Sequence, residues 1–195
     1  MRTPSQTNYG SLKMKAIILT LVSAATLSTA AFAQEVIVNG GTIKFEGEIV
    51  NAACAVDTQS ANQTVSLGQY TVKSFENGKA GATTPNMPFS IQLNDCDSTV
   101  QQNASIGFAG TTISDSVNLL AVNGGGSNIT AASGVGIEIV DNQQKAVALD
   151  GSYQTTKVLT NGSNKFDFNA RYVSTQDIPT PGAANSAVTF MVKYN

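Results

Sequence analysis

The stretch NGGTIKFEGEIVNAAC, residues 39–54, decides how the rest of this chain is interpreted. Apolar and charged side chains alternate along its middle, with Ile43, Phe45 and Ile49 set against Lys44, Glu46 and Glu48. This period of two predicts a β-strand that buries one face. Gly47 stands in the apolar row where a fourth large side chain is expected. The stretch therefore raises the question of what its apolar face packs against.

The residues before this stretch have the features of a secretory signal peptide. These features are positive residues at Lys13 and Lys15, an apolar run at 16–22 and a small-x-small cleavage site at Ala31-Phe32-Ala33. The apolar run is shorter than the ~20 residues of a membrane-spanning helix, and a buried N-terminal helix is the alternative. We expect translation to start at Met14, residues 1–33 to form a leader, and residues 34–195 to be exported.

The composition indicates one polar, weakly acidic domain. The chain has 195 residues, enough for a single domain of ordinary size. Only 12% of the residues are charged, about half the usual ~25%, which is typical of many secreted β-proteins. Removing Arg2, Lys13 and Lys15 leaves 8 of the 11 basic residues against 13 acidic ones, a net charge of about −5. The absence of a basic patch argues against nucleic acid as a partner.

The two cysteines, Cys54 and Cys96, predict one disulfide, because a lone pair in an exported chain is usually oxidised. Two free thiols are the alternative. The disulfide would close a loop of about 40 residues and stabilise the fold by ~3–4 kcal/mol, as estimated from chain entropy.

Enzymatic chemistry has little support in this sequence. The chain contains no histidine, which excludes imidazole catalysis and histidine metal sites. Asp95 and Asp97 are the one candidate carboxylate pair, and a polar strand end beside a disulfide is the simpler interpretation. We expect no catalytic residue, no metal and no cofactor.

Short strand-like runs separated by Gly, Asn and Pro turns recur along the chain. They cover residues 52–57, 63–69, 88–96, 104–110, 135–141, 164–173 and 187–195. No long segment has a helical period, so we expect at most short helical turns. This spacing of strands predicts an all-β sandwich. Its two end segments both alternate. The first either closes the sandwich of its own chain or completes the sheet of a neighbour.

Several segments together resemble the major subunit of type 1 fimbriae, which are bacterial surface fibres built by the chaperone–usher route. These segments are VNGGTIKFEGEIVNAACAVD (38–57), VSLGQ (65–69), FSIQLNDCD (89–97), LDG (149–151), FNARY (168–172) and TPGAANSAVTFMVKYN (180–195). They occur in the family's order and spacing and cover essentially the whole exported chain. The chain is thereby identified as a member of this family of pilins.

The resemblance implies an incomplete immunoglobulin-like sandwich at residues 50–195 that lacks its last strand. A periplasmic chaperone would fill the resulting groove, and at the outer-membrane usher the N-terminal extension of the next subunit would replace the chaperone. Repetition of this donor-strand exchange gives a head-to-tail fibre used for adhesion at the cell surface, with adaptor or adhesin subunits at its tip.

The resemblance also assigns roles to residues of both end segments. The donor strand is residues 34–49, and its groove-facing row is Gly41, Ile43, Phe45, Gly47 and Ile49. Gly47 would lie where the floor of the acceptor groove rises, although a bulge or twist point also accounts for a glycine. The C-terminal strand and chaperone contact comprise Gly182, Val188, Phe190, Val192, Tyr194 and Asn195.

Three alternatives remain open. The chain could be a minor adaptor subunit of the same fimbria, since adaptors share both end segments. It could be a secreted monomer whose extension folds into its own groove. A small secreted hydrolase is the third, and the lack of histidine argues against it.

Overall fold

The computed structural model describes residues 38–49, 51–75, 79–114, 116–126 and 129–195. The predicted leader and the first residues of the predicted donor strand lie outside the described residues. The chain divides between Glu46 and Gly47 into two units, and the described strands and helices belong to the second, Gly47–Asn195. No helix within the described residues is long and apolar enough to cross a membrane.

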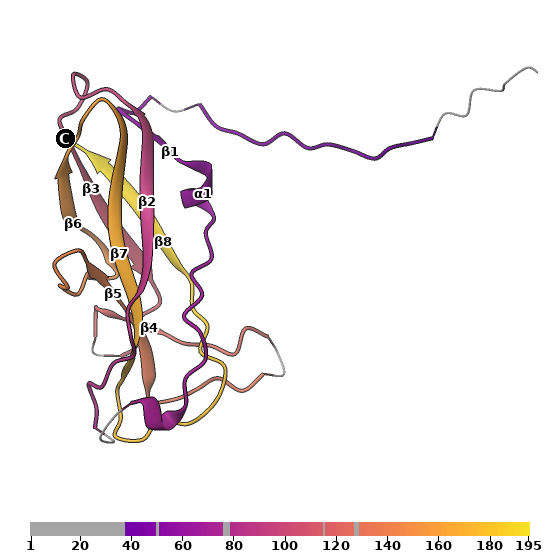
Figure 1. Cartoon of the computed structure of the whole chain (residues 1–195), viewed down its shortest axis with the longest axis vertical. Coiled ribbons are helices and arrows are strands. Elements are labelled where there is room, and N and C mark those ends of the chain that lie inside the picture. The colour runs from indigo at the N-terminus through magenta and orange to yellow at the C-terminus, as the bar shows by residue number, and fades with distance from the viewer. Residues whose placement is uncertain (1–37, 50, 76–78, 115, 127–128) are drawn as a thin grey trace, which may run out of the picture. The chain divides into compact units, whose positions relative to one another are not determined.

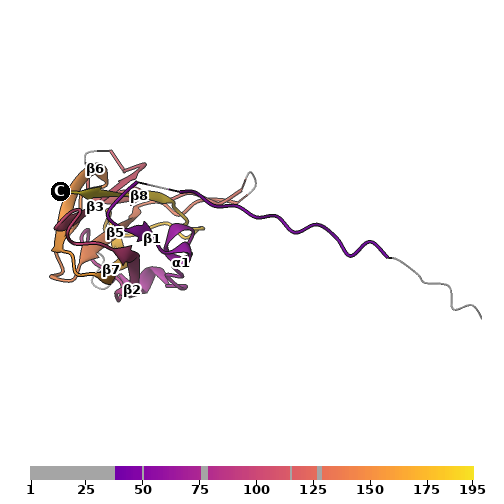
Figure 2. The ribbon, with the colours of Figure 1, turned by 90° about the horizontal axis from the view of Figure 1, so that it is seen from above.

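The second unit is a sandwich of two antiparallel sheets (Figure 1). One sheet has the strand order β1-β2-β7-β5-β4 and the other has the order β6-β3-β8. Their bounds are β1 (Ala55–Val56), β2 (Met87–Cys96), β3 (Asn103–Gly110), β4 (Leu119–Ala121), β5 (Val135–Asp141), β6 (Asp150–Val158), β7 (Gly162–Ser174) and β8 (Val188–Tyr194). Figure 2 shows the strands β6, β3 and β8 as a layer separate from β7 and β2.

The core forms where the apolar rows of the two sheets meet. In the larger sheet, Phe89 and Ile91 of β2 lie directly opposite Phe168 and Phe166 of β7, so their side chains share one face. From the smaller sheet, Phe108 of β3 meets Phe168 edge to face, with ring centroids 5.0 Å apart. The alternating apolar side chains of the two sheets thus face one common core, as the predicted sandwich requires.

Helix is confined to two short turns within the described residues, as expected. The first is α1 (Thr58–Ala61), whose N-cap Asp57 accepts a hydrogen bond from the backbone N–H of Gln59 at 2.9 Å. The second is the 3-10 turn η1 (Val72–Ser74). The predicted disulfide is present between Cys54 and Cys96, whose Cα atoms are 4.1 Å apart.

The prediction of a strand at residues 63–69 is wrong, because these residues form neither strand nor helix. An alternating pattern provides two side-chain faces, but a strand also needs a neighbouring backbone to bond with. The strand predicted at 52–57 shrinks to the two residues of β1, Ala55 and Val56, which pair with Asn94 and Leu93 of β2.

Two strands were not predicted. Most side chains of β6 are exposed and polar, so its sequence lacks the alternation that marks a half-buried strand. β4 has only three residues, which is too short for any period to appear. The strands β2, β3, β5, β7 and β8 form within about two residues of their predicted bounds.

Candidate functional site

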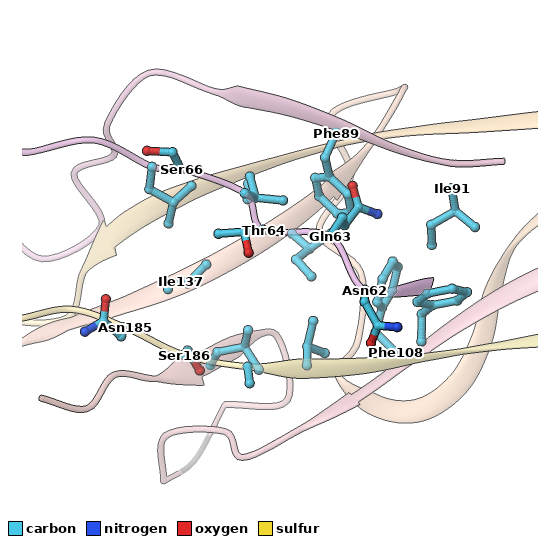
Figure 3. A pocket seen from close by; sticks show the side chains of 18 of the residues that line it. Asn62, Gln63, Thr64, Ser66, Phe89, Ile91, Phe108, Ile137, Asn185 and Ser186 are labelled. Carbon is cyan, nitrogen blue, oxygen red and sulfur yellow. The ribbon is translucent and has the colours of Figure 1, made fainter. Parts of the chain in front are cut away.

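A groove of about 770 Å³ opens into the core of the sandwich beside β8. One rim is the segment 60–68, and the other rim is residues 184–188 together with Phe190. Its floor comes from both sheets and consists of Phe89, Ile91, Phe108, Leu120, Ile137, Ile139, Ala170 and Tyr172. Figure 3 shows Asn62, Gln63, Thr64 and Ser66 along one side, and Asn185 and Ser186 along the other.

The groove has no electrostatic preference for a charged ligand. None of its described lining residues is acidic or basic. Its floor is the apolar core itself, since Ile91 and Phe108 are buried at 0% and 1% exposure. An apolar segment therefore fits the floor of this groove, and the polar side chains of its rims are uncharged.

The outer edge of β8 is open along this groove, because within the described residues β8 ends its sheet and pairs with β3 alone. Asn103 and Asn195 exchange two backbone hydrogen bonds, of 2.9 and 3.1 Å. Hydrogen-bonded and non-bonded pairs alternate along an antiparallel ladder. It follows that Val188, Phe190, Val192 and Tyr194 point their N–H and C=O groups away from β3. The β3–β8 register has no bulge, so this edge is regular along its length.

The structure brings together part of the predicted C-terminal site. Val188 and Phe190 line the groove. Val192 and Tyr194 pack on the same core nearer the end of β8 and are not among the lining residues. Asn195 continues the ladder with Asn103 beyond the end of β8.

Gly182 lies away from the groove, in the segment that leads into β8, and lines a second pocket. A Cβ atom at this position would clash with the backbone nitrogen of Ala132 and come within 2.7 Å of the carbonyl oxygen of Ala131. A glycine is required there because two backbone segments approach closely.

Two tyrosine hydroxyls hold the ends of the groove region. Tyr172 donates to the carbonyl of Ala184 at 2.9 Å, and Tyr194 donates to the carbonyl of Cys54 at 3.2 Å. Burial raises the pKa of both groups, with a smaller contribution from Tyr70 at Tyr172, so both hydroxyls stay protonated and able to donate.

The described part of the predicted donor strand, residues 38–49, forms no strand. Its apolar side chains are exposed, Ile43 at 78%, Phe45 at 91% and Ile49 at 100%. At Gly47, no atom lies within 4 Å of an added Cβ. The contacts of the chain itself therefore give no reason for a glycine at this position, whereas Gly41 has a φ of 115°, which favours glycine.

The disulfide fixes the point where this segment joins the sandwich. Cys54 and Cys96 are both buried, and the backbone N–H of Asp97 donates to the carbonyl of Ala53 at 2.9 Å. Because Tyr194 also binds Cys54, the root of the extension lies beside the end of β8.

The candidate carboxylates, Asp95 and Asp97, do not form a catalytic pair in the groove. Asp97 is exposed and accepts hydrogen bonds from the side chain and backbone of Thr99, which lower its pKa. It therefore caps a turn as an ionised group, and neither Asp95 nor Asp97 lines the groove.

Sequence reasoning missed the polar rim at 60–68 and the floor residues Leu120 and Ile137. The alternation at 63–69 was a usable signal for the rim, since its apolar Val65 and Leu67 do line the groove. The floor residues had no such signal, because only the sheet topology brings them together.

Comparison with known proteins finds relatives over nearly the whole chain. A sequence model of the fimbrial protein family, described as "Fimbrial protein", matches residues 43–195. Fimbrial subunit type 1 of Salmonella typhimurium is 47% identical over 182 residues, covering 93% of this chain and 97% of the relative. The A chain of the type-1 fimbrial protein of Escherichia coli K12 is 44% identical over 186 residues, 94% of this chain and 100% of that one.

Solved structures of pilus subunits have the same fold. A subunit of a chaperone-usher pilus superimposes with a TM-score of 0.69 at 23% identity, over 84% of this chain and 100% of the other. The P pilus rod subunit PapA gives a TM-score of 0.63 at 23% identity, over 74% of this chain and 100% of PapA.

Proposed function

This chain belongs to the fimbrial protein family and is a structural subunit of a fimbria rather than an enzyme, and from that premise we propose that its groove receives the N-terminal extension of a neighbouring subunit. The body is an immunoglobulin-like pilin sandwich, and subunits of this kind polymerise into extracellular surface fibres. The proposal concerns how neighbours are joined. Residues 34–49 of one copy would form the missing strand of the next.

The observation that carries this proposal is the open edge of β8 above an uncharged apolar groove. Val188, Phe190, Val192 and Tyr194 offer a row of unpaired backbone groups, and their side chains face the core. The extension offers a matching row, because its apolar side chains also recur every second residue.

Antiparallel pairing matches the two rows. In an antiparallel pair, residues directly opposite each other point their side chains to the same face. Placing Ile43, Phe45 and Ile49 opposite the groove-facing residues of β8 turns their backbone groups toward β8. Lys44, Glu46 and Glu48 then point to solvent. Antiparallel pairing thus satisfies the backbone and the side chains together.

The energies are large enough to hold a fibre. Four residues of β8 have one free N–H and one free C=O each, so up to eight backbone hydrogen bonds can form, each with a net value of ~0.5–1.5 kcal/mol. Burial of Ile43, Phe45 and Ile49 adds roughly 1.5–3 kcal/mol for each side chain. Dissociation of one extension should therefore be very slow.

The same open edge of β8 supports a role for assembly proteins. A regular, unpaired strand edge over an apolar groove invites wrong pairing. We propose that a periplasmic chaperone occupies the groove after export and binds the chain end at Tyr194 and Asn195. An outer-membrane usher would then exchange the chaperone strand for the next extension.

A chain that fills its own groove is the second candidate, and chain length disfavours it. Ile49 is five residue steps before Cys54, a reach of at most roughly 18 Å. Cys54 lies beside the end of β8, whose seven residues span roughly 20 Å. The chain's own extension can then lie only parallel to β8, and parallel pairing is slightly less stable.

Deletion of the extension tests the proposed function. The full chain and a version lacking residues 34–48 would each be produced with the chaperone and the usher. We expect fibres by electron microscopy, and an SDS-resistant ladder on unboiled gels, from the full chain alone. Monomers from both versions would instead assign the row at 43–49 to the chain's own fold.

A further inference from the structure

The exposed apolar side chains of the sandwich are concentrated at its two ends. Val100 and Val158 are exposed at the end where the extension joins the body, and Val117, Ile129 and Ile178 are exposed in loops at the opposite end. We propose that these two ends bind each other: the end turn of one subunit, residues 97–101, packs on the pocket beside the groove of the next subunit. This inference rests on the proposed function.

The first end is a rigid face around the root of the extension. The turn 97–101 is closed by a hydrogen bond from Val100 N–H to the carbonyl of Asp97, at 3.1 Å. The backbone N–H and the hydroxyl of Ser98 both donate to the side-chain oxygen of Asn161, which connects the turn to the loop between β6 and β7. Val100 is left 59% exposed on this tied turn, which makes it a preformed apolar knob.

The opposite end contains a pocket of about 600 Å³ that has no function in strand exchange as proposed above. It lies between the segments 68–72 and 179–185, and its apolar lining includes Val72, Phe75 and Val135. Ile178, which is 73% exposed, directly precedes the second segment. No described lining residue is charged.

This pocket is continuous with the groove. Gly68, Tyr172, Ala184 and Asn185 line both of them. Two of the shared residues, Ala184 and Asn185, lie just before β8 begins, which is where antiparallel pairing would place Ile49 of the incoming extension. The pocket therefore adjoins the point at which the extension leaves the groove and returns to its own body.

Chain length then forces the two ends together. From Ile49 to Cys54 the chain can span at most roughly 18 Å. Cys54 is bonded to Cys96, and Val100 lies on the turn that follows immediately. The body of the incoming subunit must consequently stand against the far end of its acceptor. A second copy is the occupant that this geometry supplies.

The contact would set the angle between consecutive bodies. Chain connectivity alone limits the distance between the two bodies, whereas an apolar knob seated in a pocket also fixes the angle between them. The turn 97–101 supplies the knob through Val100, and the segment 179–185 supplies the pocket wall.

Site-specific photo-cross-linking in assembled fibres tests this contact. A photoreactive aromatic amino acid would replace Val100, with a matched control at Tyr153, which is 42% exposed on the flank strand β6. After illumination and boiling, we expect a covalent dimer from position 100 and none from position 153. Mass spectrometry should map the bond to residues 68–75 or 179–185 of the second chain.

Unboiled gels of the same samples separate this inference from the proposed function. An SDS-resistant ladder without the mapped cross-link, or a cross-link to other residues, overturns the end-to-end contact while strand exchange stands. Loss of the ladder in unsubstituted fibres would overturn strand exchange itself. If the substitution at Val100 prevents assembly, the reciprocal probe at Ile178 should cross-link to residues 97–101, and its failure to do so in intact fibres also refutes the contact.

Discussion

An alanine scan along the extension should show a period of two in fibre stability. Residues whose side chains enter the groove lose their burial and leave a cavity, whereas their neighbours point to solvent. We expect large effects for Ile43→Ala, Phe45→Ala and Ile49→Ala, and small effects for Lys44→Ala, Glu46→Ala and Glu48→Ala.

The magnitudes follow from exposure. Phe45 is 91% exposed in the unpaired chain, so nearly all its side chain becomes available for burial on assembly. Truncation of a buried Phe costs ~3–5 kcal/mol, and truncation of a buried Ile costs ~2–5 kcal/mol. Surface substitutions usually stay within about 0.5 kcal/mol. A loss of about 3 kcal/mol corresponds to a roughly hundredfold faster dissociation if the contact is broken in the rate-limiting step.

Dissociation of assembled fibres in guanidinium chloride measures these losses. Fibres of each variant would be incubated over a denaturant series, and the fraction released would be read from unboiled gels. The yield of each chaperone complex controls for expression and folding of the body. A profile without alternation, or one in which Lys44, Glu46 and Glu48 carry the larger effects, would refute the antiparallel placement.

Three further substitutions test other parts of the argument. Gly47→Leu should block polymerisation, as measured by fibre yield, because its side chain would meet the raised floor of the acceptor groove. It should leave the chaperone complex intact, as measured by co-purification, because nothing in the chain itself opposes a side chain there. Normal fibre yield would refute the idea that the floor excludes a side chain at this position. Gly182→Ala should lower the melting temperature of the chaperone complex, since its Cβ would clash with backbone, whereas Gly126→Ala meets only a side chain at 3.8 Å and should not; equal melting temperatures would contradict the close approach. Hydrogen bonds from Thr99 lower the pKa of Asp97, so its carboxylate stabilises the fold above the unfolded pKa of about 3.9 and loses this effect as the pH falls through the lower folded pKa. The stability difference between wild type and Asp97→Asn should accordingly shrink on acidification below about pH 4, as thermal melts over a pH series would show, and a constant difference would argue against this role.

Side-chain alternation made the main strands predictable, and the lack of it hid the others. The rows Phe89-Ile91-Leu93 and Phe166-Phe168-Ala170 became β2 and β7, because one face of each is buried. The nine residues of β6 have no buried face of this kind, so only the hydrogen bonds to β3 reveal that strand. Residues 63–69 show the reverse case, a strand pattern without a partner backbone.

The sequence allowed a prediction for only one side of the groove, the one formed by the C-terminal strand. Val188 and Phe190 could be assigned to it because they alternate at the end of the chain. Leu120, Ile137 and Tyr172 are far from them in sequence and reach the groove through sheet order, which no local pattern encodes. The second pocket could not be predicted for the same reason, since its walls come from segments that are far apart in sequence, 68–72 and 179–185.

The two outer edges of the smaller sheet differ in a way that bears on strand exchange. The edge formed by β6 carries mostly exposed side chains, and its register with β3 shifts between Ile106 and Gly107 and again between Gly107 and Ala109. Irregularity and polar side chains are devices by which natural sheets prevent edge-to-edge pairing. The edge formed by β8 has neither device, since its ladder with β3 is regular and its groove is apolar. One sheet thus protects one edge and leaves the other ready for a strand, which is expected if pairing at β8 is the function and pairing at β6 is a hazard.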